Sequence, residues 1–353
     1  MLMKRLVCGR VRDRFRFQFG IVCFVVLLAS CGRGNDAQFL VVYTSVDEVF
    51  ARPVAERFQR DTGIEVRLVP DTEETKSTGL LNRLIAEKER PQADVFWSGD
   101  PVRAALLKAK GIAAPYRSPE AAELPPQFSD PDGYWTGFST RARVLIYNRN
   151  LVPDGQEPRS VLDLADPRFK GRAAMANPLF GTTSMHAAAL FAVLGDQKAK
   201  EFFDGFLQNG GRILSSNGEV RRRVAMGDFA VGVTDTDDAN VARLEGQPIG
   251  IIYPDHDGMG TLLVPNCAVL IANSSRPEAG RRFIDYLLRP ETEQALAESE
   301  AAQIPLRPGV PTPPGLVRLA DVKPMPVDYS SLAILLDGLS SGYLKDWADR
   351  GQR

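Results

Sequence analysis

Phe39-Leu40-Val41-Val42-Tyr43 is a continuous apolar run of the kind that a strand buried within a parallel sheet requires. The residues after it carry apolar side chains at helical spacing, and this pattern stops at Thr62-Gly63. Strand character then returns over Ile64 to Val69. These segments predict a strand, a helix and a second strand, which together are the repeating unit of an α/β domain.

The alternation of strands and helices continues along the rest of the chain. A helix with apolar residues from Leu80 to Ile85 precedes a strand over Asp94 to Trp97. Asp100 and Pro101 then mark the capped start of a third helix, which ends at Gly111. We expect later strands at residues 143–148, 172–176, 212–214 and 229–233, and later helices at residues 183–194 and 198–208.

The chain is long enough for two lobes, because its 353 residues exceed what a single hydrophobic core normally organises. We assign residues 39–150 to the first part of lobe 1, residues 151–265 to lobe 2, and residues 266–353 to the return of the chain to lobe 1. The amphipathic helices of the last segment should cover lobe 1. Two lobes joined by more than one crossing form a hinged pair, with the ligand in the cleft at the strand ends.

The N-terminus has the pattern of a bacterial export signal. Six basic residues within the first sixteen precede an uncharged apolar stretch from Gly20 to Ala29, so we predict a signal peptide at residues 1–30. Leu28-Ala29-Ser30-Cys31 is typical of a lipoprotein-processing site, and acyl chains on Cys31 would hold the protein at the membrane surface through a linker at residues 31–38. An ordinary signal peptide followed by a chance cysteine is the alternative.

Composition argues for a binding protein rather than a nucleic-acid-binding protein or an enzyme. The chain has 43 basic and 44 acidic residues, so nothing indicates a polyanionic partner. Two histidines and no glycine-flanked nucleophile offer little for acid-base or serine-histidine catalysis. Cys267 stands in an apolar run and is expected to be a buried free thiol without a catalytic role.

The most distinctive polar segment is Thr234-Asp235-Thr236-Asp237-Asp238, directly after a predicted strand. Three aspartates within four residues repel one another unless a cation balances their charge. A solvated loop that caps the following helix explains the same residues. The spacing alone leaves both interpretations open.

Three other polar segments occupy predicted turns between a strand and a helix, where clefts are built. They are residues 44–48, which include Asp47, residues 98–100, and residues 180–184. The first two also suit helix N-caps, and the third opens a helix whose free N–H groups favour an anion. Asp255-His256-Asp257-Gly258 has the composition of a metal cluster, but its glycine favours a plain turn.

Six blocks stand in a specific order and spacing: Val41 to Ser45, Thr62 to Val66, Ala93 to Ser98, Ser139 to Tyr147, Pro167 to Arg172 and Pro277 to Leu288. In this arrangement the chain resembles the bacterial periplasmic ferric-iron-binding proteins, which are the solute-binding components of iron ABC transporters. The resemblance covers nearly the whole mature length. It implies an α/β, two-lobed periplasmic-binding-protein fold of type II, with hinged lobes and mixed sheets.

In that family a pair of adjacent tyrosines, often with a histidine and a carboxylate, holds ferric iron beside a bound anion. The resemblance places the tyrosine pair on Asp237 and Asp238, the histidine on Asp47, and the carboxylate on Gly99, next to Asp100. With Asp235 these aspartates form the candidate metal ligands. The candidate anion contacts are Gly181, Thr182, Thr183, Asn217, Arg141 and Arg143.

Aspartate at the ligand positions keeps hard oxygen donors, which suit ferric, calcium, magnesium or manganous ions. Together with the lipoprotein-processing site at Cys31, the resemblance implies a monomeric, lipid-anchored, periplasmic component of an ABC importer that works with a permease and its ATPase. It would bind ferric iron with a synergistic anion and use no catalytic cofactor. An organic solute with an ammonium group and a phosphonate, phosphate or carboxylate group is the alternative. An exported metal-dependent hydrolase is a more remote one.

Overall fold

The computed structural model describes residues 39–71 and 78–351. The predicted signal peptide, Cys31 and the linker up to residue 38 lie outside these ranges. Within the described ranges, no helix combines the length and the apolar character needed to cross a membrane.

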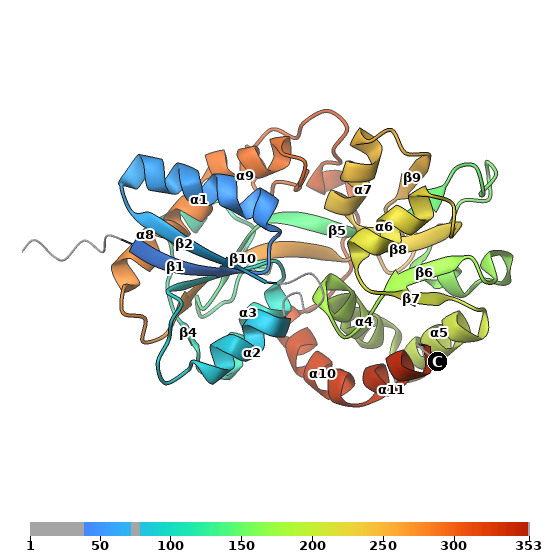
Figure 1. Cartoon of the computed structure of the whole chain (residues 1–353), viewed down its shortest axis with the longest axis horizontal. Helices are drawn as coiled ribbons and strands as arrows, with labels where there is room; N and C mark the ends of the chain where they lie inside the picture. The colour runs from blue at the N-terminus through green and yellow to red at the C-terminus, as the bar shows by residue number, and fades with distance from the viewer. Residues whose placement is uncertain (1–38, 72–77, 352–353) are drawn as a thin grey trace, which may run out of the picture. The chain divides into compact units, whose positions relative to one another are not determined.

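In the described part of the chain, ten strands join edge to edge in one mixed sheet, in the order β2-β1-β3-β10-β5-β8-β6-β7, with β4 beside β10 and β9 beside β5 (Figure 1). Their bounds are β1 Phe39–Thr44, β2 Glu65–Pro70, β3 Val95–Ser98, β4 Ala113–Ala114, β5 Thr136–Asn148, β6 Ala173–Ala176, β7 Arg212–Leu214, β8 Val231–Asp235, β9 Ile249–Ile252 and β10 Leu263–Ile271. β1 runs parallel to β2 and β3, and β6 runs parallel to β7 and β8. β10 runs antiparallel to β3 and β5. The predicted mixed α/β class is confirmed.

Strand β5 carries the chain from one half of the sheet to the other. Its residues 136–142 pair with β10, and its residues 143–148 pair with β8 and β9. We call the half with β1, β2, β3 and β10 lobe 1, and the half with β6, β7 and β8 lobe 2. The chain therefore enters lobe 2 within β5, a few residues before the boundary expected at residue 151. No turn marks this crossing, because the strand continues through it.

Along the described chain, helices α1 to α7 lie between strands, and α8 to α11 follow the last strand, β10. Their bounds are α1 Glu48–Thr62, α2 Thr78–Ala86, α3 Pro101–Ala109, α4 Gly181–Leu194, α5 Asp196–Gln208, α6 Asn217–Ala225, α7 Thr236–Leu244, α8 Pro277–Leu287, α9 Pro290–Glu298, α10 Tyr329–Ser341 and α11 Tyr343–Gly351. In lobe 1, α1 packs against α8, where the ring of Phe58 meets Phe283 and Tyr286 edge to face at 5.0 and 5.3 Å between centroids. The helix expected after the first strand is thus confirmed by its buried apolar face.

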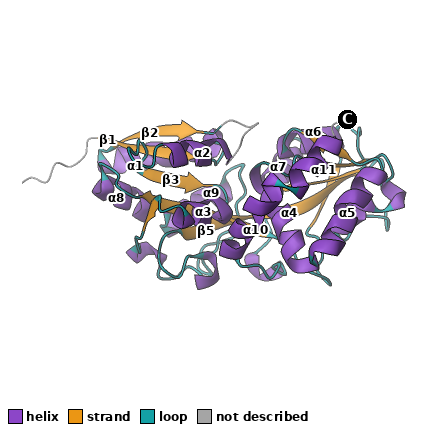
Figure 2. Cartoon of the chain, turned by 90° about the horizontal axis from the view of Figure 1, so that it is seen from below, coloured by secondary structure: helices purple, strands orange, loops and turns teal. Residues whose placement is uncertain are grey.

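The last two helices do not cover lobe 1 as expected. α10 contacts both α3 and α4, so it spans the two lobes (Figure 2). α11 packs on α5 of lobe 2, where the Trp347 indole donates to the Phe203 carbonyl at 2.7 Å and its ring lies 5.1 Å from the Phe203 ring. The aromatic side chains of α5 provide the apolar surface that α11 buries.

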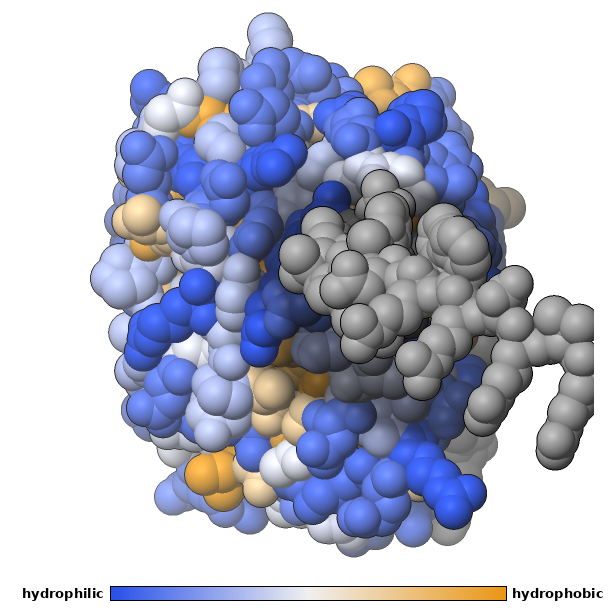
Figure 3. Space-filling view, turned by 90° about the vertical axis from the view of Figure 1, so that its left-hand side faces the viewer, coloured by the Kyte–Doolittle hydropathy of each residue, from blue (hydrophilic) through white to orange (hydrophobic). Residues whose placement is uncertain are grey.

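The exposed large apolar side chains of the described residues are scattered over the surface. Figure 3 shows a largely hydrophilic face on which apolar residues occur in small groups. The most exposed large apolar side chains, Val49, Met226, Leu244 and Ile334, lie on or next to four different helices. Isolated apolar side chains of this kind are normal on a protein surface.

Candidate ligand-binding site

A cavity opens between the lobes where parallel strands end. Lobe 1 contributes Ser45 and Asp47 from the turn after β1, and Arg141 comes from β5. Lobe 2 contributes Ala176, Asn177, Phe180, Gly181, Thr182, Thr183, Ser215, Ser216, Asn217, Asp235, Asp237 and Asp238. The space measures about 560 Å³, including the part open to solvent.

Strand geometry explains why these residues meet. Ser45 follows β1, Asn177 follows β6, Ser215 follows β7, and Asp235 is the last residue of β8. The carboxyl ends of parallel strands face the same edge of a sheet, and ligands of open α/β sheets bind there. The cavity thus occupies the position that the alternation of strands and helices predicts.

The two lobes touch beside the cavity through Arg103 of α3. Its guanidinium donates to the Ser184 hydroxyl at 2.8 Å and to the Gly181 carbonyl at 3.5 Å, both at the start of α4. Arg103 is almost completely buried. The described structure therefore holds the lobes in contact at this edge of the cleft.

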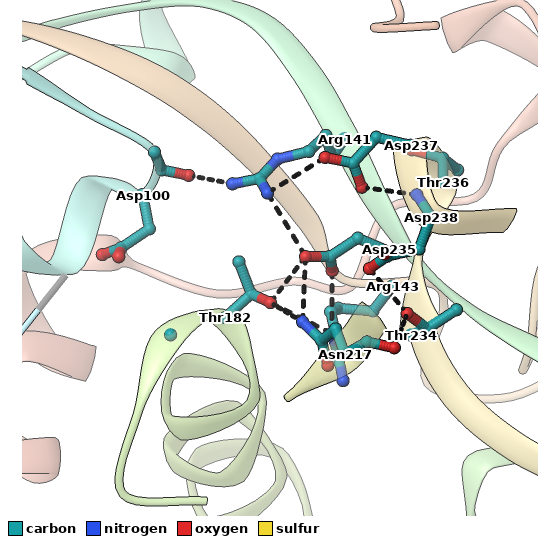
Figure 4. A network of polar contacts seen from close by, with 12 residues as sticks. Asp100, Arg141, Arg143, Thr182, Asn217, Thr234, Asp235, Thr236, Asp237 and Asp238 are labelled. Carbon is teal, nitrogen blue, oxygen red and sulfur yellow. Dashed lines mark hydrogen bonds and ion pairs between the residues drawn. The ribbon is translucent and has the colours of Figure 1, made fainter. Parts of the chain in front are cut away.

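Three carboxylates converge on the lobe 2 side of the cavity. One oxygen from each of Asp235, Asp237 and Asp238 lies within 4.8 Å of the others (Figure 4). Asp237 and Asp238 stand in the first turn of α7, where negative charge is favoured by the helix dipole. Asp235 precedes that helix, but its side chain makes no capping hydrogen bond. Helix capping alone therefore does not account for the group.

Arg141 links this acidic group to lobe 1. Its guanidinium lies 3.3 Å from the Asp235 carboxylate and 3.5 Å from that of Asp237, and it also donates to the Gly99 carbonyl. Burial disfavours the charged guanidinium, but the carboxylates around it, led by those of Asp237 and Asp235, raise the pKa of Arg141. Arg141 thus stays protonated and places a positive charge at the wall of the cavity.

Arg143 forms a fully buried ion pair behind the cavity. Its guanidinium donates to Asp235 at 2.8 Å and to the Thr182 hydroxyl at 3.0 Å, and it faces Nδ1 of His186 at 3.4 Å. Burial and then the Arg143 charge lower the pKa of His186 to about 3. His186 is therefore neutral at physiological pH and stands behind the cavity wall rather than in it.

Most of the residues predicted for the site line this cavity. They are Asp47, Arg141, Gly181, Thr182, Thr183, Asn217, Asp235, Asp237 and Asp238. Arg143 lies one layer deeper.

Asp100 differs from the other candidate ligands. It is completely buried, and its carboxylate accepts from the Arg103 backbone N–H at 3.0 Å as the N-cap of α3. Figure 4 shows that carboxylate directed away from Asp235, Asp237 and Asp238. Asp100 thus has the capping role that its sequence position also predicted, and it does not reach the cavity.

Sequence reasoning did not select Ser215, Ser216 and Asn177, which also line the cavity. Each follows the end of a short strand in lobe 2. The rule that ligands gather at strand ends would have identified them. Among the described residues, no tyrosine lines this cavity.

Two further predictions from the sequence are confirmed. Asp255 stands at a turn with a φ of 61° and accepts a hydrogen bond from the Val161 backbone N–H at 3.1 Å, as a turn residue does. Cys267 is fully buried in β10, and burial raises the pKa of its thiol. Neither residue reaches the cavity between the lobes.

Several curated proteins resemble the chain over most of its length. Iron uptake protein A1 of Synechocystis sp. is 28% identical over 83% of this chain and 85% of its own length. The Fe(3+)-binding periplasmic protein of Serratia marcescens is 26% identical over 84% of this chain and 87% of its own length.

Solved structures share the fold. Iron-bound HitA from Pseudomonas aeruginosa matches with a TM-score of 0.77 and 24% identity, over 86% of this chain and 98% of that one. The periplasmic binding protein AfuA from Actinobacillus pleuropneumoniae, solved with fructose-6-phosphate bound, matches with a TM-score of 0.75 and 22% identity, over 86% of this chain and 97% of that one. These are two-lobed binding proteins, which confirms the two-lobed fold predicted here.

The sequence profile described as "Bacterial extracellular solute-binding protein" matches residues 54–324. This match covers most of both lobes, including every strand except β1 and all the cavity-lining residues except Ser45 and Asp47. The chain therefore belongs to the bacterial extracellular solute-binding protein family.

Proposed function

We propose that this protein is the lipid-anchored solute-binding component of an ABC importer and that it carries ferric iron as its cargo. The observation that supports the iron proposal most is the group of three carboxylates in the cavity, with Asp47 on the opposite wall. Carboxylate oxygens are hard donors, which hard cations prefer. The relatives that are named for iron uptake and for Fe(3+) binding support the same cargo.

The charge of the cavity also favours a cation. The carboxylates of Asp47, Asp235, Asp237 and Asp238 line the cavity. Carboxylates that lie close together repel one another, and a cation that they share relieves this repulsion.

The candidate metal-binding aspartates come from both lobes, which suggests how cation binding changes the conformation. Asp47 belongs to lobe 1, and Asp237 and Asp238 belong to lobe 2. A cation bound by all three joins the lobes and stabilises the closed form relative to the open form. The permease would recognise that closed form, and its ATPase would drive release.

An organic solute with an ammonium group is the second candidate. The cavity wall carries the hydroxyls of Ser45, Ser215 and Ser216 and the amide of Asn177, which suit a polar organic molecule. The Asp237 and Asp238 carboxylates would pair with the ammonium group. The exported hydrolase ranks below both, because no histidine or glutamate among the described residues lines the cavity as a general base.

Titration with ferric nitrilotriacetate tests the iron proposal and its ligand set together. We expect saturable binding of one iron per protein. The holo protein should be nearly colourless in the visible region, because no described tyrosine lines the cavity to supply a phenolate-to-iron charge-transfer band. A strong visible band on iron binding would mean that a tyrosine ligates the metal and would contradict this set of carboxylate ligands.

A further inference from the structure

The Asp235 carboxylate lies at the centre of a network of donors from three different elements (Figure 4). Its Oδ1 accepts from Arg143 of β5 at 2.8 Å. Its Oδ2 accepts from the Thr182 hydroxyl of α4 at 2.7 Å, from the Asn217 amide of α6 at 3.2 Å, and from Arg141 of β5 at 3.3 Å. Asp235 is only 2% exposed.

These donors are the same groups that the family resemblance assigned to a separate anion. Thr182 stands at the start of the 14-residue helix α4, where backbone N–H groups and the helix dipole favour negative charge. Asn217 is held in place because its side-chain oxygen accepts from the Thr183 hydroxyl at 3.1 Å. The donors at this position thus suit an anion, and the Asp235 carboxylate of the chain itself already accepts their hydrogen bonds.

The Asp235 carboxylate pairs with two guanidinium groups in this setting. Arg143 lies 2.8 Å from its Oδ1, and Arg141 lies 3.3 Å from its Oδ2. A free phosphate or carboxylate would therefore have to compete for donors already in use, beside a fixed negative charge.

We infer that Asp235 is a specificity-determining residue whose carboxylate serves as a built-in anion at the start of α4. The cavity then takes its cation without a free anion beside it, and it rejects phosphate, phosphonate and carboxylate groups at this position. The statement about the cation rests on the function proposed above, whereas the rejection of anions does not.

The test is calorimetric titration of inorganic phosphate into metal-free protein. We expect no binding to the wild-type protein at millimolar phosphate. Asp235→Ser shortens the side chain, removes the charge and releases the donors, so it should bind phosphate at least about tenfold more tightly than the wild-type limit. Asp235→Asn also removes the charge, but it keeps one acceptor oxygen and adds an amide donor, so its gain should be smaller. Thermal unfolding establishes that both variants are folded.

Asp238→Asn is the matched control, because it removes the same charge from the same group. Asp238 accepts from Thr234 at 2.9 Å and makes none of the four contacts described above. This control should not gain phosphate binding. The inference is overturned if the wild-type protein binds phosphate, if a folded Asp235 variant gains no binding, or if Asp238→Asn gains as much. No arm uses a metal, so failure here is distinguishable from failure of the iron proposal.

Discussion

Replacing Asp237 with lysine should weaken binding of ferric iron by about 30-fold or more. Asp237 lies in the first turn of α7, faces Arg141 and belongs to the converging carboxylates. Removing one partner of a buried charge pair costs about 2–5 kcal/mol, and each 1.4 kcal/mol is a factor of ten in affinity. Competition against nitrilotriacetate, followed by calorimetry, measures the change.

Two further variants show whether the loss of iron affinity comes from the change at Asp237 or from the change in net charge. Asp257→Lys makes the same charge change on an exposed residue outside the cavity, so it should bind iron as the wild-type protein does. Asp237→Asn keeps the shape of the side chain and should lose less affinity than the lysine variant. Unchanged affinity in a folded Asp237→Lys protein would remove Asp237 from the site and leave it as a helix-start residue.

Replacing Cys31 with alanine should abolish acylation and release the protein from membranes. One acyl chain binds a membrane only marginally, whereas several acyl chains on one residue hold a protein stably, so loss of the modified cysteine removes the whole anchor. Fractionation after a salt wash, combined with labelling by a radioactive fatty acid, measures both effects. We expect label and membrane association in the wild-type protein and neither in the variant.

Cys23→Ala is the control for this experiment, because Cys23 lies in the apolar stretch of the predicted signal and should leave with it. It should keep both the label and the membrane association. The mass of Cys31→Ala shows whether its signal peptide was removed, since an uncleaved signal would also hold the protein at the membrane. Absence of the fatty-acid label from the wild-type protein would contradict the lipoprotein prediction.

Local patterns were sufficient for much of the fold. The apolar run Phe39 to Tyr43 forms β1 with its inner residues buried. Asp100 and Pro101 open α3 as their cap chemistry predicts. In these cases the signal lies within one turn or one strand of the residue concerned.

The features that the sequence analysis placed wrongly depend on contacts between residues far apart in the chain, which no local pattern contains. β5 changes partners between Ala142 and Arg143 without a break in the strand, so the entry into lobe 2 has no sequence mark. α11 packs on lobe 2 because Trp347 contacts Phe203, which lies 144 positions earlier in the chain. Amphipathic spacing predicted the helix, but not the surface that it covers.

The sequence predicted that the site lies at strand ends, but it did not predict which contacts each aspartate makes. From the sequence alone, Asp235, Asp237 and Asp238 are three similar carboxylates. Their roles separate only when β5 and α4 bring Arg143 and Thr182, 92 and 53 positions away, against Asp235. The pairing of β5 with β8 and the position of α4 decide that Asp235, rather than Asp237 or Asp238, contacts Arg143 and Thr182.

The most direct test of the central claim, that the cavity carries a metal cation, is elemental analysis combined with native mass spectrometry of the protein as purified from the membranes of its native cells. We predict about one equivalent of iron per chain and no bound organic molecule. Metal-free protein that carries a stoichiometric organic solute would contradict the claim and would favour the ammonium-bearing ligand instead.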